Sequence, residues 1–292
     1  MKLVSYTLEG AVRVGHLNAD GTAVQAFRGE AGSSMLNLIR LFEHLDAADA
    51  DQTEWVELDR VQLLAPIPRP ARNIFCVGKN YHEHALEFQA SGFDASASEN
   101  IPEYPVVFTK APSTVIGPEM AIPAYLDYSD STDYEGELAV VIGRGGRNIT
   151  KVDALSHVFG YTIVNDVTSR TLQQTHRQWF LGKSLDGYCP MGPTIVTADE
   201  IPAPEQLQLK TWVNGELRQN AGVGNLIFDI PSLIETISRT MSLESGDIIA
   251  TGTCAGVGIG FKPPKFLRHG DRVEIEIQPI GRLSNPVIGR HE

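Results

Sequence analysis

The segment DYEGELAVVIG, residues 133–143, constrains the fold more than any other stretch of this chain. Its run LAVVI is apolar at every position, which is typical of a central strand buried on both faces. Glu135 and Glu137 stand directly before that run. Because side chains at positions i and i+2 of a strand point to the same face, the two carboxylates should project together. The sequence therefore predicts a pair of acidic groups at the end of a buried strand.

Strand-like runs dominate the chain beyond residue 70. They are rich in β-branched and aromatic residues. The runs are NIFCVG, PVVFTK, LAVVIG, VFGYTIVND, PTIVTA, LKTWVNG, GDIIATG and DRVEIEIQPIG. Two helical segments stand out among them, DALSHV near residue 153 and DIPSLIETISRTMS from residue 229. In the second, Asp229 can cap the helix, and one face carries Ile230, Leu233, Ile234, Ile237 and Met241.

The first 70 residues form a separate, smaller unit in this interpretation. Residues 2–8 and 11–17 are strand-like runs on either side of Glu9-Gly10, which indicates a hairpin. From Ser34 onward, a helix is predicted by apolar residues at helical spacing, namely Met35, Leu38, Ile39, Phe42 and Leu45. The stretch APIPRPARN, residues 65–73, then carries three prolines and cannot be helix interior. We therefore predict a small N-terminal domain over residues 1–70 and a second domain over residues 71–292.

Charge and cysteine content exclude several classes of protein. The formal net charge is -12 at pH 7, whereas nucleic-acid and anionic-membrane partners need basic patches. The three cysteines are far apart and outside any CxxC pattern, which argues against a disulfide framework and a zinc site. No stretch approaches the roughly 18 apolar residues of a membrane span, and Glu9 and Arg13 interrupt the N-terminal run. We expect a cytoplasmic protein whose partners are small molecules or other proteins.

The paired glutamates suggest a metal site. Bringing two carboxylates together costs free energy unless a cation lies between them or one takes up a proton. Asp166 ends the run VFGYTIVND, much as Glu135 opens the run LAVVIG. Two neighbouring strands could therefore bring three carboxylates together. All-oxygen ligation favours Mg²⁺ or Mn²⁺ over zinc. The alternative is that Glu135 and Glu137 form the solvated face of an edge strand, and spacing alone leaves both interpretations open.

Five motifs occur in the order seen in the fumarylacetoacetate hydrolase superfamily, which the chain resembles over residues 72 to about 289. They are GKNYHEHALE, DYEGELAVVIG, NDVTSRTLQ, QWFLGKSLDGYCPMGP and SGDIIATGTCAGVG. The resemblance is to the acylpyruvase-like and 2-hydroxyhepta-2,4-diene-1,7-dioate isomerase-like members. It implies a mainly β fold with α (α+β), in which a mixed β-sandwich roll follows a small N-terminal α/β domain, and it implies a homodimer. It also implies Mg²⁺ or Mn²⁺ held by Glu135, Glu137 and Asp166.

The same resemblance implies four residues that act on the substrate. Arg170 and Gln173 match residues that orient the substrate, and Thr253 matches a threonine near the substrate carboxylate. Lys183 matches the family's active-site lysine. The chain departs from the founding hydrolase, which adds an aspartate ahead of its glutamate pair. The segment VGKNY offers Asn80 and Tyr81 in that region, so a fourth protein ligand to the metal is in doubt.

His84 and Glu87 match a His–Glu pair that lies on a substrate-ordered lid in the short-chain acylpyruvase-like members. The two residues are three positions apart, so one helical turn lets the carboxylate polarise the imidazole as a general base. His82, in the same segment, is a competing candidate. The polar stretch over residues 87–105 is long for a connection, which favours a mobile loop.

A site of this kind is suited to 2-oxo acids. We expect hydrolysis of a C–C bond in acylpyruvates or related 2,4-dioxo acids, with water activated by His84 and Glu87 and the oxyanion stabilised by Lys183. Isomerisation or hydration of 2-hydroxy-dienoates in aromatic catabolism and decarboxylation of oxaloacetate would pass through the same enolate. The complete set of site residues argues against a catalytically silent binding protein.

Overall fold

The structure is a computed structural model, and it describes residues 1–41, 54–93 and 101–290. Its strands are β1 (Lys2–Leu8), β2 (Ala11–Leu17), β3 (Ala23–Ala26), β4 (Val56–Glu57), β5 (Gln62–Leu63), β6 (Ile74–Gly78), β7 (Val106–Lys110), β8 (Val115–Ile116), β9 (Thr132–Asp133), β10 (Gly136–Ile142), β11 (Val158–Asn165), β12 (Thr168–Ser169), β13 (Cys189–Thr197), β14 (Gln208–Val213), β15 (Glu216–Gly222), β16 (Ile248–Ala250), β17 (Arg272–Ile277) and β18 (Gly281–Pro286). Its α-helices are α1 (Met35–Leu41), α3 (His82–Ala90), α4 (Arg170–Thr175), α5 (Phe180–Lys183) and α6 (Ile230–Thr240). Within these ranges, no helix combines the length and the apolar character of a membrane span.

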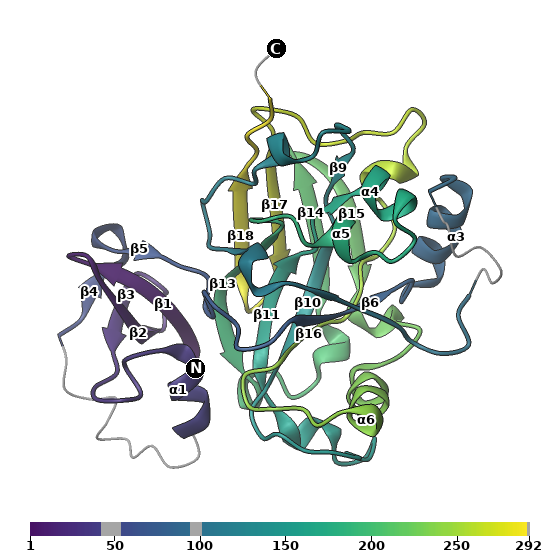
Figure 1. Ribbon diagram of the computed structural model, residues 1–292. Helices are drawn as coiled ribbons and strands as arrows, with labels where there is room; N and C mark the ends of the chain where they lie inside the picture. The colour runs from purple at the N-terminus through teal and green to yellow at the C-terminus, as the bar shows by residue number, and fades with distance from the viewer. Residues whose placement is uncertain (42–53, 94–100, 291–292) are drawn as a thin grey trace.

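One large mixed sheet runs through the molecule (Figure 1). Its strand order is β4-β3-β2-β1-β13-β11-β10-β16-β6-β7, with β5 beside β1 and β8 beside β13. Most pairs are antiparallel, while β16 and β6 run parallel. Every residue of β10 is buried, and the strand has neighbours on both sides, β11 and β16. The predicted central strand is therefore confirmed, and so is the mainly β fold with few helices.

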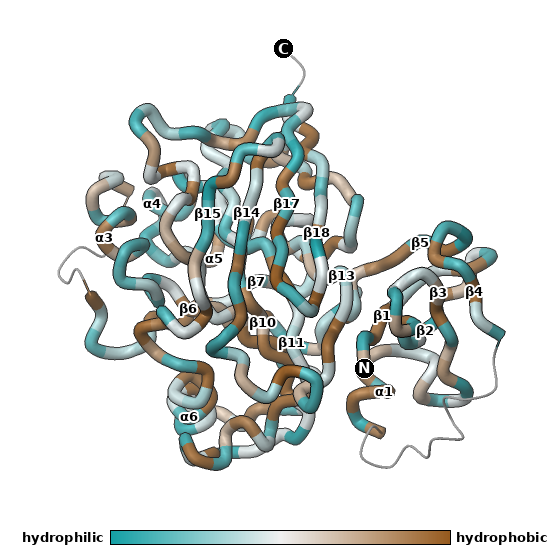
Figure 2. The backbone as a smooth tube through the Cα atoms, turned by 180° about the vertical axis from the view of Figure 1, so that it is seen from behind, coloured by the Kyte–Doolittle hydropathy of each residue, from teal (hydrophilic) through white to brown (hydrophobic). Residues whose placement is uncertain are grey.

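The hydrophobic core lies on both faces of this sheet. Leu138 and Val140 of β10 share one cluster with Leu209 of β14 and Ile275 of β17, from a second sheet of order β15-β14-β17-β18. The alternate residue Val141 belongs to a cluster on the opposite face, which also contains three residues of α1. Figure 2 shows the contrast along the chain, since the tube over β10 is largely brown and the tube over β15 is largely teal. The central strand thus lies between two apolar layers.

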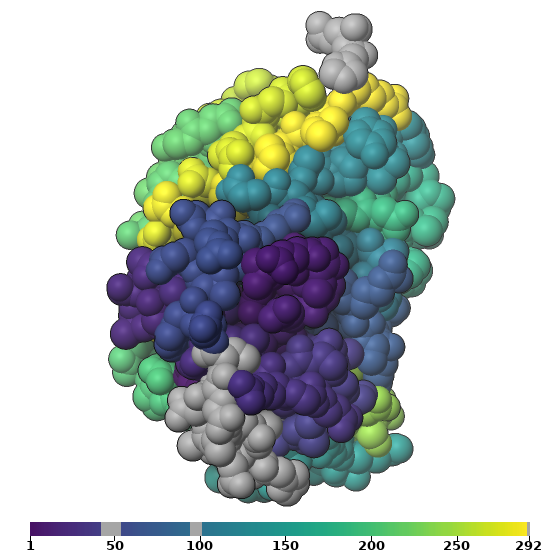
Figure 3. Space-filling view, turned by 90° about the vertical axis from the view of Figure 1, so that its left-hand side faces the viewer, coloured from purple at the N-terminus to yellow at the C-terminus, as the bar shows by residue number. Residues whose placement is uncertain are grey.

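The N-terminal strands are continuous with the large sheet. The β1–β2 hairpin is confirmed, with positive φ angles at Glu9 and Gly10 in its turn. β1 pairs with β13 through Lys2 and Leu3, which places residues of the N-terminal segment against the larger body (Figures 1 and 3). The helix predicted from Ser34 is α1, and positions Phe42 and Leu45 of its predicted face lie outside the described residues. The proposed division near residue 70 stays a prediction.

The other helical segments differ in detail from the predictions. α6 begins as expected, because the carboxylate of Asp229 accepts a hydrogen bond from the backbone N–H of Ser232. Met241 was expected on its apolar face, but it follows the helix and is 37% exposed. The segment near residue 153 is a 3₁₀ turn over Ala154–His157 rather than an α-helix. The start of the stretch predicted as a loop, residues 87–90, belongs to α3, and residues 94–100 lie outside the described residues.

Gly136 lets the end of β10 that carries the two glutamates pack closely against the second sheet. A Cβ at this position would lie 2.4 Å from Thr211 Oγ1 of β14. We expect Gly136→Ala to lower the free energy of unfolding by about 1–3 kcal/mol, because the added methyl group overpacks the contact between the sheets. The matched control is Gly222→Ala in β15, where the nearest atom to an added Cβ is 3.6 Å away. Urea denaturation would measure both, and equal stability of the two variants would contradict the packing argument.

Candidate functional site

Three carboxylates converge where β10 and β11 meet. One oxygen from each of Glu135, Glu137 and Asp166 lies within 4.8 Å of the others, and all three residues are buried. The backbone brings them together, because the N–H of Asp166 donates to the carbonyl of Glu135 at 2.8 Å. The side chain of Asn165 accepts from the N–H of Glu135 at 3.0 Å. The solvated edge-strand interpretation of the glutamate pair is therefore wrong.

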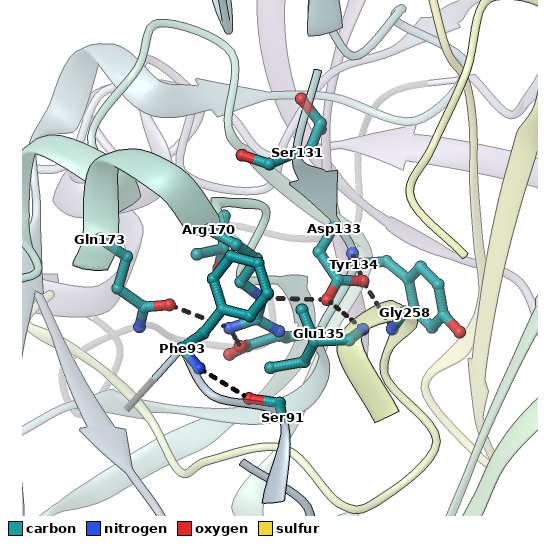
Figure 4. Close-up of polar contacts among 12 residues, drawn as sticks. Ser91, Phe93, Ser131, Asp133, Tyr134, Glu135, Arg170, Gln173 and Gly258 are labelled. Atoms are coloured by element: carbon teal, nitrogen blue, oxygen red, sulfur yellow. Dashed lines mark hydrogen bonds and ion pairs between the residues drawn. The ribbon is translucent and has the colours of Figure 1, made fainter. Parts of the chain in front are cut away.

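Three buried cations contact these carboxylates, and Lys183 and Arg170 are the two that contact Glu135. Lys183 Nζ lies 2.8 Å from Glu135 Oε2 and 2.6 Å from Asp166 Oδ2. Arg170 Nη1 lies 2.6 Å from Glu135 Oε1, and its Nε donates to Asp133 Oδ2 at 2.9 Å (Figure 4). Burial alone would raise the pKa of Glu135, but Lys183 and then Arg170 outweigh burial and hold this pKa at about 2. Glu135 is thus kept ionised.

Glu137 has the opposite electrostatic setting. Burial, followed by the charges of Asp166 and Glu135, raises its pKa well above the ordinary value. Its carboxylate accepts a hydrogen bond from the backbone N–H of Gly252 at 2.8 Å. Asp166 Oδ1 lies 2.8 Å from Lys110 Nζ, but it accepts no well-aligned hydrogen bond within the described residues. Both carboxylates therefore have capacity for a further cationic partner.

A divalent cation fits the charge of the cluster. Four buried carboxylates, those of Asp133, Glu135, Glu137 and Asp166, face three buried cations, Lys110, Arg170 and Lys183. With all of these groups ionised, one negative charge is in excess in a region of low dielectric, which is costly and is the reason that the pKa of Glu137 is raised. A doubly charged ion among the oxygens would change the excess to one positive charge, and Mg²⁺ and Mn²⁺ prefer such oxygen ligands. The residues present therefore fit the metal that the family resemblance implies.

His84 and Glu87 form a pair on α3. His84 Nδ1 lies 3.2 Å from Glu87 Oε2. Glu87 also accepts hydrogen bonds from the backbone N–H of Gly256, at 3.0 and 3.2 Å to its two oxygens. This fixes the carboxylate, which in turn can hold Nδ1–H and leave Nε2 as the acceptor nitrogen. His82, the competing candidate, is exposed and lines a different surface hollow.

One small pocket unites most of the predicted residues. Its free volume is about 10 Å³, which is about the room that one water molecule needs. The predicted residues that line it are His84, Glu135, Arg170, Gln173, Lys183 and Thr253. Gln173 Oε1 accepts from Arg170 Nη1 at 3.2 Å, and Thr253 Oγ1 donates to the carbonyl of Gly136 at 2.9 Å. Glu87 contacts the pocket through His84, while Glu137 and Asp166 lie beside Glu135.

Two buried charges of this cluster were not predicted from the sequence, and one further residue was left in doubt. Asp133 accepts from the N–H groups of Gly258 and Ile259 as well as from Arg170 (Figure 4). Lys110 Nζ donates to the carbonyl of Val167 and also contacts the carbonyl of Lys183. The signal for Asp133 was its place two residues before Glu135, and the signal for Lys110 was a charge ending an apolar run.

Asn80 has a structural role in the described contacts. Its side-chain amide donates to the carbonyls of Thr251 and Phe228, at 2.7 and 3.0 Å. Its oxygen accepts from the N–H of Phe228 at 2.8 Å. These bonds tie the end of β6 to the segment before α6, so the amide is already satisfied and is a poor candidate for a metal ligand.

Comparisons with known proteins agree with this geometry. The family model described as "Fumarylacetoacetate (FAA) hydrolase C-terminal" matches residues 73–288. The oxaloacetate tautomerase YisK of Bacillus subtilis is 55% identical over 230 residues, which cover 79% of this chain and 74% of that protein. The solved structure of a fumarylacetoacetate hydrolase from Exiguobacterium antarcticum is 42% identical, with a TM-score of 0.85 and coverage of 99% and 100% of the two chains.

A further solved structure bears on the chemistry of the site. It is the maleylpyruvate hydrolase of Sphingobium sp. SYK-6 in complex with a manganese(II) ion and pyruvate. It is 30% identical to this chain, with a TM-score of 0.79 and coverage of 99% and 100% of the two chains. A metal and a 2-oxo acid are thus bound together by a protein that this chain resembles along nearly its whole length.

Replacing Glu137 by Gln should separate metal binding from folding. The amide keeps the size of the side chain but removes one anionic ligand, so we expect the Mn²⁺-dependent rise in melting temperature to disappear. In excess chelator the variant should be at least as stable as the parent protein, because a buried, poorly compensated carboxylate has been removed. Thermal unfolding with and without Mn²⁺ measures both effects. An undiminished Mn²⁺ response would remove Glu137 from the set of ligands.

The raised pKa of Glu137 also predicts a pH dependence of the metal-free protein. Above the ordinary glutamate pKa of 4.5, the folded state holds a proton that the unfolded chain has lost. The free energy of unfolding in chelator should therefore fall as pH rises above this value, until the raised pKa is passed. The lowered pKa of Glu135 has the opposite effect, because it makes the free energy of unfolding rise with pH, and it acts only below pH 4.5. Urea denaturation from pH 5 to 9 should show a smaller decline for Glu137→Gln, and identical slopes would contradict this assignment.

Proposed function

Because the chain belongs to the fumarylacetoacetate hydrolase family, we propose that it is a divalent-metal-dependent tautomerase that interconverts the keto and enol forms of oxaloacetate. One observation carries the chemistry, namely that a fixed His–Glu pair and the acidic cluster open onto the same small pocket. The choice of oxaloacetate is supported by the name and the 55% identity of the Bacillus subtilis relative. Tautomerisation thus takes precedence over the hydrolysis that the motifs alone favour.

The pocket supplies donors for an anionic substrate. Arg170 Nη2 is buried and has no hydrogen-bond partner within the described residues, so it can donate to a substrate carboxylate. Gln173 accepts a hydrogen bond from Nη1 of the same guanidinium and so fixes its direction. Bound Mg²⁺ or Mn²⁺ would lie among Glu135, Glu137 and Asp166 and would stabilise negative charge on the keto oxygen. Lys183, whose ammonium contacts two of these carboxylates, adds positive charge beside the same oxygen.

His84 is positioned to move the proton. Tautomerisation transfers a proton between C3 and the keto oxygen, and a neutral imidazole can accept it at one site and return it at the other. Glu87 supports this exchange, because its carboxylate stabilises the imidazolium that forms when His84 takes the proton. Glu87 is itself held by Gly256. No water is consumed in this reaction, in contrast to hydrolysis.

Hydrolysis of an acylpyruvate is the second candidate. It is supported by the likeness to maleylpyruvate hydrolase and by the same His–Glu pair, which could activate a water instead of a C–H bond. Isomerisation of 2-hydroxy-dienoates and decarboxylation of oxaloacetate remain further alternatives. The homodimer and the cytoplasmic location stay predictions, and size-exclusion chromatography with light scattering would test the first.

The test compares two neighbouring histidines. With Mg²⁺ or Mn²⁺, the protein should accelerate the loss of the ultraviolet absorbance of enol-oxaloacetate without releasing carbon dioxide. His84→Asn should lower kcat by about 100-fold or more, because it removes the proton acceptor. The control His82→Asn, on the exposed side of the same helix, should keep kcat within about twofold.

The metal response distinguishes a lost base from a damaged site. Mn²⁺-dependent stabilisation should be the same in His84→Asn and the parent protein. Full activity of the His84→Asn variant would exclude His84 as the base. Cleavage of acetylpyruvate or fumarylpyruvate into two fragments, without acceleration of the oxaloacetate tautomerisation, would favour the hydrolase instead.

A further inference from the structure

Gln219 is a buried amide to which neither the motifs nor the chemistry above gives a role. It lies on β15, an edge strand of the second sheet, and it is the one buried residue of that strand, with an exposed fraction of 0% (Figure 1). The inward position of a sheet with one solvated face ordinarily carries an apolar side chain. A buried amide costs free energy unless its hydrogen bonds are made. Its partners therefore decide what this residue does.

The amide of Gln219 closes a ring of hydrogen bonds around Gly136. Its Oε1 accepts from the N–H of Gly136 at 3.1 Å, and its Nε2 donates to Thr253 Oγ1 at 2.8 Å. Thr253 Oγ1 in turn donates to the carbonyl of Gly136 at 2.9 Å. Glycine allows this close approach, since a Cβ at position 136 would lie 3.2 Å from Gln219 Oε1. Both backbone polar groups of Gly136 therefore have side-chain partners.

This ring continues the support of β10 past the end of its neighbouring strand. The ladder between β10 and β16 joins Ala139, Val140 and Val141 to β16, and Gly136 lies beyond the last of these pairs. Gln219 and Thr253 supply hydrogen bonds there that a strand would otherwise supply, as buried backbone groups require. Side chains thus hold the two peptide units that separate the glutamates at positions 135 and 137.

The same amide also holds the loop after β16. Gln219 Nε2 donates to the carbonyl of Cys254 at 2.8 Å. Two residues earlier in this loop, the N–H of Gly252 donates to Glu137 Oε2 at 2.8 Å. A hydrogen bond that fixes the loop at Cys254 thus supports the donor that orients a proposed metal ligand. Gln219 reaches the acidic cluster by two routes, through the backbone of Gly136 and through this loop.

We propose that Gln219 is a positioning residue of the metal site, which holds Glu135 and Glu137 at the spacing that one divalent ion requires. The two carboxylates repel each other, so a fixed backbone is needed to keep an oxygen of each within reach of one ion. The amide of Gln219 bonds to backbone groups and to Thr253 rather than to the carboxylates. This assignment rests on the metal site of the proposed function, but not on oxaloacetate as the substrate.

Gln219→Met tests this assignment, because it nearly keeps the length of the side chain and removes both hydrogen-bonding groups. The dissociation constant of Mn²⁺ would be measured by calorimetry on the full-length protein at one pH and without substrate. We expect the variant to bind Mn²⁺ about 10- to 100-fold more weakly, the range for a lost partner that orients metal ligands.

The matched control is Asn285→Leu on β18, the opposite edge strand of the same sheet. The amide of Asn285 is also buried, and it donates to the carbonyls of Gly117 and Met120, at 2.9 and 2.8 Å. Both variants should lower the melting temperature in excess chelator, because each leaves buried backbone carbonyls without a donor. Asn285→Leu should keep the Mn²⁺ dissociation constant within about twofold, since its contacts are separate from the acidic cluster.

Two further variants complete the design. Gln219→Asn keeps an amide but is one methylene shorter, so it should lose part of the hydrogen-bond ring and also weaken Mn²⁺ binding. It gives a second measurement should the methionine variant fold poorly. Thr253→Val breaks the same ring at another member. If Gln219 acts through this ring, combining Thr253→Val with Gln219→Met should weaken binding by less than the product of the two separate factors.

The outcomes separate this assignment from the proposed reaction. Unchanged Mn²⁺ binding in the Gln219 variants overturns the role of Gln219 and leaves the metal site in place. Equal weakening by Asn285→Leu overturns it as well, because the effect would then be a general loosening of the second sheet. If the parent protein binds no Mn²⁺, the metal site and this role fail together. If the Gln219 variants alone lose affinity but the parent does not turn over enol-oxaloacetate, the tautomerase proposal fails and the role of Gln219 stands.

Discussion

The structure depends on the compensation of buried negative charge at the end of its central strand. Glu135 and Glu137 flank Gly136 at the end of a strand that is buried throughout, and Gly136 itself packs closely against β14. The compensating cations come from three distant segments, at Lys110, Arg170 and Lys183. Because no segment can bury its own charges alone, assembly of the core and assembly of the site are one event. The remaining negative charge favours a further cation, and the all-oxygen set of side-chain atoms favours Mg²⁺ or Mn²⁺ as that cation.

A single loop holds three of the acidic side chains by its backbone. After β16, the N–H of Gly252 donates to Glu137, the N–H of Gly256 donates to Glu87, and two further N–H groups donate to Asp133. The glycines also provide space, since a Cβ at Gly258 would lie 2.5 Å from Asp133 Oδ1 and one at Gly260 would lie 1.8 Å from Glu87 Oε1. The loop therefore connects the proposed base, a proposed metal ligand and the partner of Arg170 through backbone hydrogen bonds.

Much of this arrangement was predictable from the sequence, for identifiable reasons. The run LAVVI and the hairpin at Glu9-Gly10 follow from local patterns, and the apolar face of α6 follows from helical spacing. β15 was missed because its sequence ELRQNAG is polar, as suits an edge strand paired on one side only. Convergence of Asp166 with the glutamates could be proposed from strand ends, but not demonstrated, since strand order is a property of the whole sheet. Lys79 and Lys110 were missed because a lysine in a sequence is ordinarily solvated, and only the folded chain shows these two to be buried.

The electrostatics of the pocket also determine which residue can transfer a proton. Burial would lower the pKa of Lys183, but the charges of Asp166 and Glu135 outweigh burial and raise it. The pKa of Arg170 is raised by Glu135 and Asp133 in the same way. Both groups are therefore held as cations and are poor bases, whatever their distance from the substrate. His84 also lines the pocket and is the proposed proton acceptor, because a neutral imidazole carries a lone pair. In the proposed mechanism, the acidic cluster therefore does more than offer ligands to a metal. It keeps Lys183 and Arg170 charged, which suits them to charge stabilisation and leaves the proton transfer to His84.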